Sequence, residues 1–192
     1  MKPIGVSLLT ICGIDELPEH GPRAVTHVLS LLDPNWPELT SFGSYGEHRR
    51  TTLRFHDIID PGYGRVLPTR EHVGEILAFG SQLAAEAEAR SDRHLLVHCH
   101  MGISRSTAAM LSLMAQVNPE EGENQLFERL RAIRPQAWPN SLMVGYADDI
   151  LGRDGRLVAA LRRHYGFQVR AKPQYVDWMT QLGRVRELDM AE

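Results

Sequence analysis

Cysteine is scarce in this sequence, and its scarcity excludes several classes of protein. The 192 residues contain two cysteines, Cys12 and Cys99. A small disulfide-stapled fold needs more of them, and a structural zinc site needs a tighter cluster of Cys and His, so we expect no metal centre. Two isolated thiols suit a reducing compartment, which predicts a cytoplasmic location. Cys12 is interpreted as a core thiol.

The sequence also lacks a long hydrophobic run and a strong excess of one charge. No apolar stretch approaches the roughly 20 residues of a membrane-spanning helix. The apolar segment after Lys2 contains Gly5 and Ser7 and lacks a signal-peptide cleavage pattern, so we interpret it as a strand. The formal net charge of −3 gives no bulk attraction to nucleic acid. We therefore expect neither membrane nor nucleic acid as a partner.

Short apolar runs dominate the first half of the chain, and helical spacing dominates the second half. This order favours an α/β fold with a single central sheet flanked by helices. We expect one domain over residues 1–192, with a helical C-terminal extension from about residue 155. Strands are predicted at Ile4–Ile11, Val25–Leu32, Thr51–Phe55 and Leu95–Val97. Helices are predicted after Pro68, over Ser106–Ala115, after a cap at Asn118 and Pro119, after a cap at Asn140 or Ser141, and near Leu157–Tyr165 and Gln174–Leu188.

One segment carries residues suited to chemistry. Residues 97–106 read Val-His-Cys-His-Met-Gly-Ile-Ser-Arg-Ser, between an apolar strand and a buried helix. The loop therefore lies at a helix N-terminus, where backbone N–H groups lack helical partners and the helix dipole attracts an anion. Gly102 permits the tight backbone path that such a loop requires.

Three side chains of this loop are the predicted reactive groups. Cys99 begins the loop, and the field there favours its thiolate, which is the nucleophilic form. Arg105 can bind two phosphate oxygens with its planar guanidinium group. Ser106 can donate a hydrogen bond to the sulfur and make it a better leaving group. A lone cysteine is commonly a buried structural thiol, but the register with Gly102 and Arg105 favours catalysis without a cofactor.

The string resembles the signature of the dual-specificity and protein tyrosine phosphatase superfamily, His-Cys-x-x-Gly-x-x-Arg-Ser/Thr. The resemblance extends over roughly Val25 to Leu151 and implies that family's fold. It also implies hydrolysis of a phosphate monoester, on a phosphorylated protein or a small molecule, through a phosphocysteine intermediate. In that reading Cys99 is the nucleophile, Arg105 binds the phosphate and Ser106 assists departure of the thiolate. The implied phosphate-binding backbone amides are those of His100, Met101, Gly102, Ile103 and Ser104, and His98 matches a histidine that supports the cysteine.

The resemblance also implies an aspartic acid that acts as a general acid on a separate loop. Asp57 is the better candidate because it directly follows a predicted strand, and Asp60 is the second candidate. The interval of 42 positions between Asp57 and Cys99 is longer than in compact family members. An Asp at a strand end is also common in simple turns. The pair Pro139-Asn140 resembles one that the family places beside the phosphate, although Asn140 also suits a helix cap.

Three other functions compete with a protein tyrosine or dual-specificity phosphatase. A catalytically silent phosphate-binding module would have the same fold. An inositol-phosphate phosphatase resembles a motif with lysines where this chain has His100 and Ile103. A rhodanese-like sulfurtransferase also uses a cysteine loop, but the Ser-Arg-Ser ending argues against it. Specificity for phosphotyrosine depends on the depth of the pocket, which the loops Asp33–Gly46 and Ile58–Leu67 are expected to set.

Overall fold

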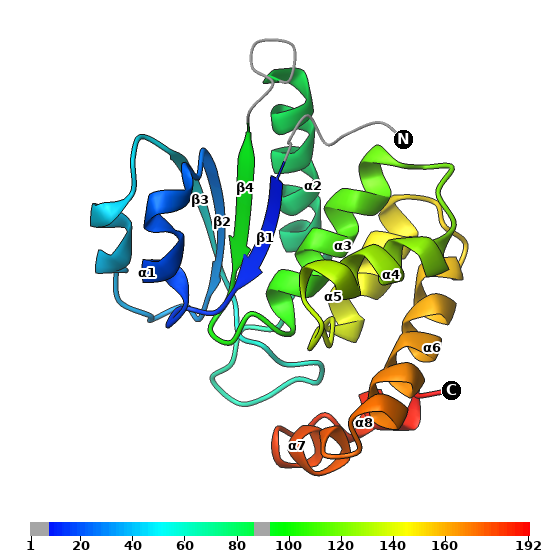
Figure 1. The fold of residues 1–192 in the computed structure, drawn as a ribbon. Coiled ribbons are helices and arrows are strands. Elements are labelled where there is room, and N and C mark those ends of the chain that lie inside the picture. The colour runs from blue at the N-terminus through cyan, green and yellow to red at the C-terminus, as the bar shows by residue number, and fades with distance from the viewer. Residues whose placement is uncertain (1–7, 87–92) are drawn as a thin grey trace.

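The computed structural model describes residues 8–86 and 93–192, and a parallel sheet forms their centre (Figure 1). Because every neighbouring pair of strands is parallel, the carboxyl ends of the strands meet at one edge. The predicted α/β fold with a single central sheet flanked by helices is confirmed. In spatial order the strands are β1 (Leu8–Cys12), β4 (His94–His98), β2 (His27–Leu32) and β3 (Arg49–Arg54).

The burial of each strand matches its position in the sheet. Every residue of β2 and β4 is buried, as expected for central strands of a parallel sheet covered on both faces. The edge strands β1 and β3 each expose part of their length. Three of the strands begin and end within three residues of the predicted positions. The predicted strand Ile4–Ile11 corresponds to β1, and its part before Leu8 lies outside the described residues.

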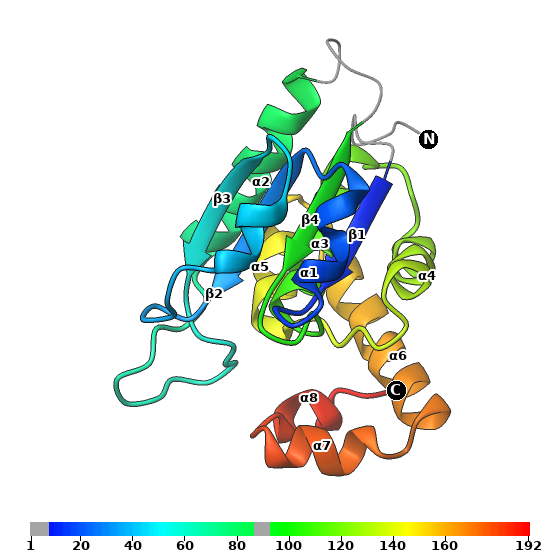
Figure 2. The same cartoon turned by 60° about the vertical axis from the view of Figure 1, so that its left-hand side comes forward.

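Helices cover the two faces of the sheet unequally (Figure 2). One face carries the short helix α1 (Leu17–His20) and two 3-10 turns, η1 (Gly21–Arg23) and η2 (Thr40–Ser44). The other face carries five longer helices, which enclose the main core together with the sheet. They are α2 (Arg70–Ala85), α3 (Arg105–Val117), α4 (Glu123–Ile133), α5 (Ser141–Ile150) and α6 (Arg156–Ala171).

The two cysteines lie in different cores. Cys99 belongs to the main core, whereas Cys12 packs with Leu17, Val28 and Phe42 in a smaller core under α1 and η2. Burial, reinforced by the negative charge of nearby Glu16, raises the pKa of Cys12 to about 12. This thiol is therefore protonated at neutral pH, which fits its interpretation as a core thiol.

The predicted start of the helix that follows α3 is wrong. Asn118 was expected to cap this helix, but it ends α3 instead: its backbone N–H and its side-chain amide both donate to the carbonyl of Met114. A turn follows, and α4 begins at Glu123 after Gly122. The carboxylate of Glu121 pairs with Arg129 at 2.5 Å. A cap motif read from sequence does not distinguish the start of one helix from the end of another, because Asn suits both.

The C-terminal segment forms two helices where one was predicted. Helix α7 (Tyr175–Gln181) and helix α8 (Val185–Asp189) are separated at Gly183, whose φ of +71° turns the chain. The two helices, here called the C-terminal pair, lie beyond the carboxyl edge of the sheet (Figure 1). Among residues 8–86 and 93–192, no helix is both long enough and apolar enough to cross a membrane.

Buried Glu187 fastens the C-terminal pair to the rest of the fold. Its carboxylate accepts hydrogen bonds from the indole of Trp138 and the backbone N–H of Ser141, both at 2.8 Å. It also pairs with Arg184 at 3.2 Å. Because Glu187 is fully buried, these three donors replace all of its hydration.

We expect Glu187→Ala to reduce the free energy of unfolding by about 3–5 kcal/mol, because it leaves Nη1 of buried Arg184 and two N–H donors without their acceptor. Urea denaturation measures this change. Glu120→Ala is the matched control: its exposed side chain makes no ion pair in the described part of the chain, so we expect a change within about 0.5 kcal/mol. Equal unfolding curves for the two variants would contradict the anchoring role of Glu187.

Candidate active site

The loop between β4 and α3 lies at the carboxyl edge of the sheet (Figure 1). It contains residues 99–104 and is called the anion loop below. β4 is buried along its whole length, and α3 is buried from Arg105 to Ala115, so both ends of the loop are fixed by the main core. The predicted strand–loop–helix context of the cysteine motif is present.

Every carbonyl of residues 100–104 is bonded to a donor outside the anion loop. The donors come from four different segments of the chain. The pairs are His100 O with Ile14 N (2.9 Å), Met101 O with Arg134 Nη2 (3.0 Å), Gly102 O with Arg134 Nε (2.9 Å), Ile103 O with Trp138 N (2.9 Å), and Ser104 O with Ala108 N (3.0 Å) and Asn140 N (3.4 Å).

The backbone N–H groups of the same loop have no such partners. None of those from residues 100–105 donates a hydrogen bond to another group in the part of the chain that the structure describes. Carbonyls that point outward leave the N–H groups pointing inward, and the N-terminus of α3 adds the positive end of its dipole. This arrangement is a binding site for an anion with several oxygen atoms.

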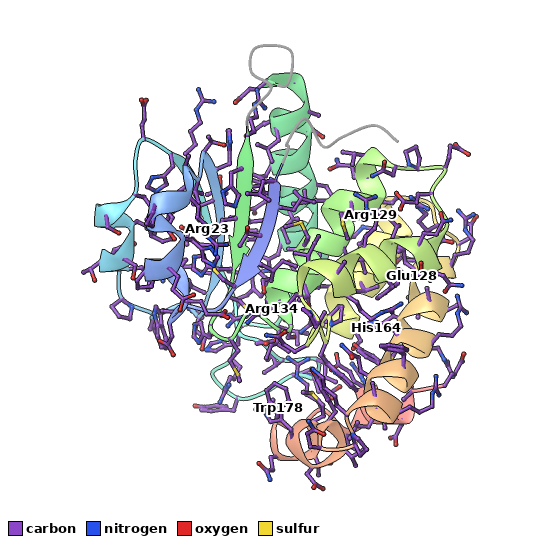
Figure 3. The ribbon with its side chains drawn as sticks, viewed as in Figure 1. Arg23, Glu128, Arg129, Arg134, His164 and Trp178 are labelled. Carbon is purple, nitrogen blue, oxygen red and sulfur yellow. The ribbon has the colours of Figure 1, made fainter. Side chains whose placement is uncertain are left out.

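Arg134 holds two of these carbonyls, and the sequence analysis did not identify it. It lies just after α4 and next to the end of the sheet (Figure 3). Its guanidinium group also makes two hydrogen bonds of 2.8 Å to the carboxylate of Glu16, which accepts in turn from Gly13 N at 2.5 Å. Glu16 and Arg134 are 118 positions apart, so no local pattern could have predicted this pair.

Gly102 is required for two separate reasons. Its φ is +69°, in the left-handed region that favours glycine. A Cβ atom at this position would lie 2.4 Å from the carbonyl carbon of Cys12 and 2.6 Å from Gly13 N. The anion loop thus passes so close to the end of β1 that a side chain would displace one of the two backbones.

Cys99 and Ser106 are brought together as the motif predicts. Cys99 Sγ lies 3.2 Å from Ser106 Oγ, and both residues are buried. His98, one residue earlier, makes a 2.7 Å hydrogen bond from Nε2 to Ser30 Oγ. Burial lowers the pKa of His98 to about 4, so its charge does not change near neutral pH. Its place in the structure fits a support for the cysteine and not a proton carrier.

One edge of the Arg105 guanidinium group carries an unpaired N–H donor. Nη1 donates to Asp33 at 2.8 Å and to the carbonyl of Phe55 at 2.6 Å. Nε is buried and has no hydrogen-bond partner within the described residues. A buried donor without a partner is costly unless a ligand satisfies it, so this edge is available to the oxygen atoms of a bound anion. Asp33 directly follows β2, and the sequence analysis did not identify it as a site residue.

Asp57 lies against the anion loop, whereas Asp60 does not. Oδ1 of Asp57 accepts hydrogen bonds from Ser104 Oγ at 2.7 Å and from the Asn140 side chain at 3.1 Å. The carboxylate of Asp60 pairs with Arg186 at 2.7 Å, and both of these side chains are about half exposed. Of the two candidates from the sequence, Asp57 is therefore the one that the structure places beside the anion loop.

The protonation of Asp57 depends on opposing effects. Burial raises the pKa of Asp57, but the positive charges of Arg184 and Arg105 and the hydrogen bonds from Ser104 and Asn140 outweigh burial. The pKa of this carboxyl group therefore lies below its ordinary value. In the absence of a bound anion, Asp57 is a carboxylate at neutral pH.

Asn140 and His100 complete the surroundings of the loop. Asn140 caps α5 by accepting from Met143 N at 3.2 Å, and the same side chain donates to Asp57, so both roles considered for it are compatible. His100 contacts Trp36 with ring centroids 4.1 Å apart and lies 3.7 Å from Asp33. The rings of His100 and Trp36 therefore pack against each other beside the anion loop.

Residues 8–86 and 93–192 hold no group of three or more His, Cys, Asp or Glu side chains suited to binding a metal ion.

The parallel sheet and the unit formed by β4, the anion loop and α3 belong to a known class of fold. The chain has the fold of the dual-specificity and tyrosine phosphatases. The likeness to Tk-PTP in its active form covers 80% of this chain and 99% of that one, with a TM-score of 0.52 and 17% identity. For DUSP15 the coverage is 85% and 94%, the TM-score 0.56 and the identity 20%.

A third solved structure, the human tyrosine phosphatase-like serine/threonine/tyrosine-interacting protein, matches over 78% of this chain and 95% of its own, with a TM-score of 0.56 and 15% identity. No family model and no curated protein sequence matches the chain. At these identities the likeness establishes the fold. It therefore confirms the fold that the sequence resemblance implied.

We expect Gly102→Ala to weaken the binding of vanadate, an anion of phosphate-like shape, at least about tenfold, since a displaced loop loses more than ~1.4 kcal/mol of binding free energy. Isothermal titration calorimetry measures this. Gly152→Ala is the matched control, because Gly152 has a similar φ of +62° but no atom within 4 Å of the added Cβ. Unchanged vanadate affinity in Gly102→Ala would show that the close approach to β1 does not shape the anion loop.

Proposed function

We propose that this protein hydrolyses phosphate monoesters through a covalent phosphocysteine, as a protein tyrosine or dual-specificity phosphatase. The observation that carries the proposal is the anion loop itself: its carbonyls are bonded outward, its N–H groups are unpaired, and Cys99 begins it. The unpaired Nε of Arg105 supports the same conclusion, because a phosphate oxygen would satisfy it.

In the first step the thiolate of Cys99 attacks phosphorus. An S–P bond forms while the bond from phosphorus to the ester oxygen breaks, and Asp57 gives its proton to that oxygen. The N–H groups of the anion loop and the guanidinium group of Arg105 stabilise the equatorial oxygens of the transferring phosphoryl group. No metal ion takes part in this scheme.

In the second step water replaces the sulfur. The carboxylate of Asp57 accepts a proton from the water, an O–P bond forms, and the S–P bond breaks to release phosphate. Ser106, at 3.2 Å from the sulfur, stabilises the departing thiolate with a hydrogen bond. Asp57 is then protonated again and ready for the next turnover.

A bound phosphate monoester raises the pKa of Asp57, which allows this residue to act as an acid. In the free protein, the carboxylate form of Asp57 is favoured by Arg184 and Arg105. A phosphate monoester in the anion loop adds negative charge beside it and neutralises Arg105, and both effects raise the pKa of Asp57. The substrate therefore promotes protonation of its own general acid.

We expect Cys99→Ser to abolish hydrolysis of an aryl phosphate in the presence of a chelator while vanadate binding is retained, because the anion loop remains and the nucleophile is lost. Cys12→Ala, in the other core, is the control and should keep its activity. A wild-type protein that binds vanadate without turnover would indicate a silent phosphate-binding module. Persulfide formation from thiosulfate would indicate a sulfurtransferase.

We expect the rate with phenyl phosphate, which has a poor leaving group, to fall as the pH rises through the pKa of Asp57, since the proton donor is lost. The pKa of free Asp57 is lowered, so the fall in kcat/KM should occur at lower pH than the fall in kcat, which reports the complex. Asp57→Asn should remove the pH dependence and slow this substrate about 10²–10⁴-fold. Asp60→Asn should leave the pH dependence and the rate with phenyl phosphate unchanged. If Asp60→Asn removes the pH dependence and Asp57→Asn does not, Asp60 is the acid.

A further inference from the structure

Arg184 bonds the C-terminal pair to the site. This residue lies between α7 and α8 and is 5% exposed. Its Nη2 donates to Oδ1 of Asp57, to the backbone carbonyl of Asp57 at 2.9 Å and to Ser104 Oγ at 3.2 Å. Its Nη1 pairs with Glu187. A single guanidinium group therefore contacts the loop after β3, the anion loop and α8 together.

The hydrogen bonds to Asp57 are all on one oxygen atom. Oδ1 accepts from Ser104, Asn140 and Arg184. Within the described residues, no hydrogen bond involves Oδ2. A carboxyl group whose Oδ1 is held by three donors can carry a proton only on Oδ2, because a proton on Oδ1 would displace one of those donors. The carboxyl group is thus fixed with one defined proton-bearing oxygen.

The site also has a wall formed by the C-terminal pair. A cleft beside the anion loop is lined by Met101, Ile103, Trp178 and Leu182, with Asp57 and Arg184 among its other lining residues. Figure 3 shows Trp178 on the side of α7 toward the sheet. The C-terminal pair therefore borders the position where the leaving group of a substrate would meet its proton donor.

The charged and titratable groups around Asp57 come from several elements. Those that act on it most directly are the two guanidinium groups of Arg184 and Arg105. The groups that interact with Asp57 or with its partners include Arg105 and His100 from the anion loop and the start of α3, Tyr165 from α6, Arg184 before α8, and Glu187 of α8.

We propose that Arg184 is a positioning residue for the reaction: it fixes Oδ1 of Asp57 and leaves Oδ2 as the oxygen that delivers the proton. The inference rests on the proposed function, in which Asp57 is the general acid. It makes the C-terminal pair a part of the active site, since Arg184 is held by the anchor at Glu187. Lowering of the pKa of Asp57 by the charge of Arg184 is a consequence of the same contact.

The test compares Arg184→Met with Arg186→Met, its neighbour on the C-terminal pair. Arg186 pairs with Asp60 at the surface and serves as the matched control. The rates of nitrophenyl phosphate (good leaving group) and phenyl phosphate (poor leaving group) are measured as a function of pH. In Arg184→Met we expect the fall in kcat at high pH to move upward by about 1 unit or more, because the carboxylate loses an adjacent positive charge. The ratio of nitrophenyl to phenyl rates should also rise, and Arg186→Met should match the wild type.

Two further variants separate positioning from stability. Arg184→Lys keeps the charge but not the guanidinium fork, so the pH dependence should stay near that of the wild type while the ratio of rates rises. In an Asp57→Asn background, Arg184→Met should add no further change to this ratio, because Arg184 acts through Asp57.

A loss of rate in Arg184→Met that is equal for both substrates and at every pH would overturn the proposal, and so would an unchanged ratio in Arg184→Lys. If Arg184→Met does not fold, Arg184→Lys decides the question by itself. A wild-type protein that is inactive, or a Cys99→Ser protein that is active, would instead refute the proposed function, so the two failures are distinguishable.

Discussion

The site depends on where the backbone carbonyls of the anion loop find their donors. A tight loop can direct its N–H groups inward only if the opposite ends of the same peptide units are satisfied outside. Here the outer donors come from Ile14 just after β1, from Arg134, from the chain entering α5 and from the first turn of α3. The anion loop is therefore held from outside by segments that are distant in sequence. Its shape is a property of the whole fold, and the motif alone would not maintain it.

The same loop connects Cys99 with Asp57. Ser104 closes the anion loop and donates to Asp57, and Asn140 caps α5 and donates to the same oxygen. Arg184 adds the C-terminal pair to this group. Because Ser104, Asn140 and Arg184 are buried and all three are bonded to Asp57, a change at one of these residues alters the hydrogen bonding of the carboxylate. The anion loop and the carboxylate of Asp57 are thus coupled through a few hydrogen bonds.

The comparison with solved structures shows how little sequence this fold requires. DUSP15 shares 20% identity with the chain, and yet 94% of its length can be superimposed. The sheet needs only buried apolar strands, which many sequences can provide. The anion loop is stricter, because it needs a residue without a Cβ atom at Gly102, where φ is positive and the end of β1 is close. This strict position is one that the motif contains.

The sequence alone was sufficient for the features that depend on neighbouring residues. It located the strands, the buried helix after the anion loop, and the register of Cys99, Gly102 and Arg105, since each follows from local periodicity or local backbone geometry. It did not identify Asp33, Arg134 or Arg184, whose partners are 72, 118 and 127 positions away. Such contacts carry no local pattern, because only the packing of β2, α4 and the C-terminal pair around one edge of the sheet brings them together. The tertiary structure therefore decided which charges surround the anion loop, and the sequence decided that the loop exists.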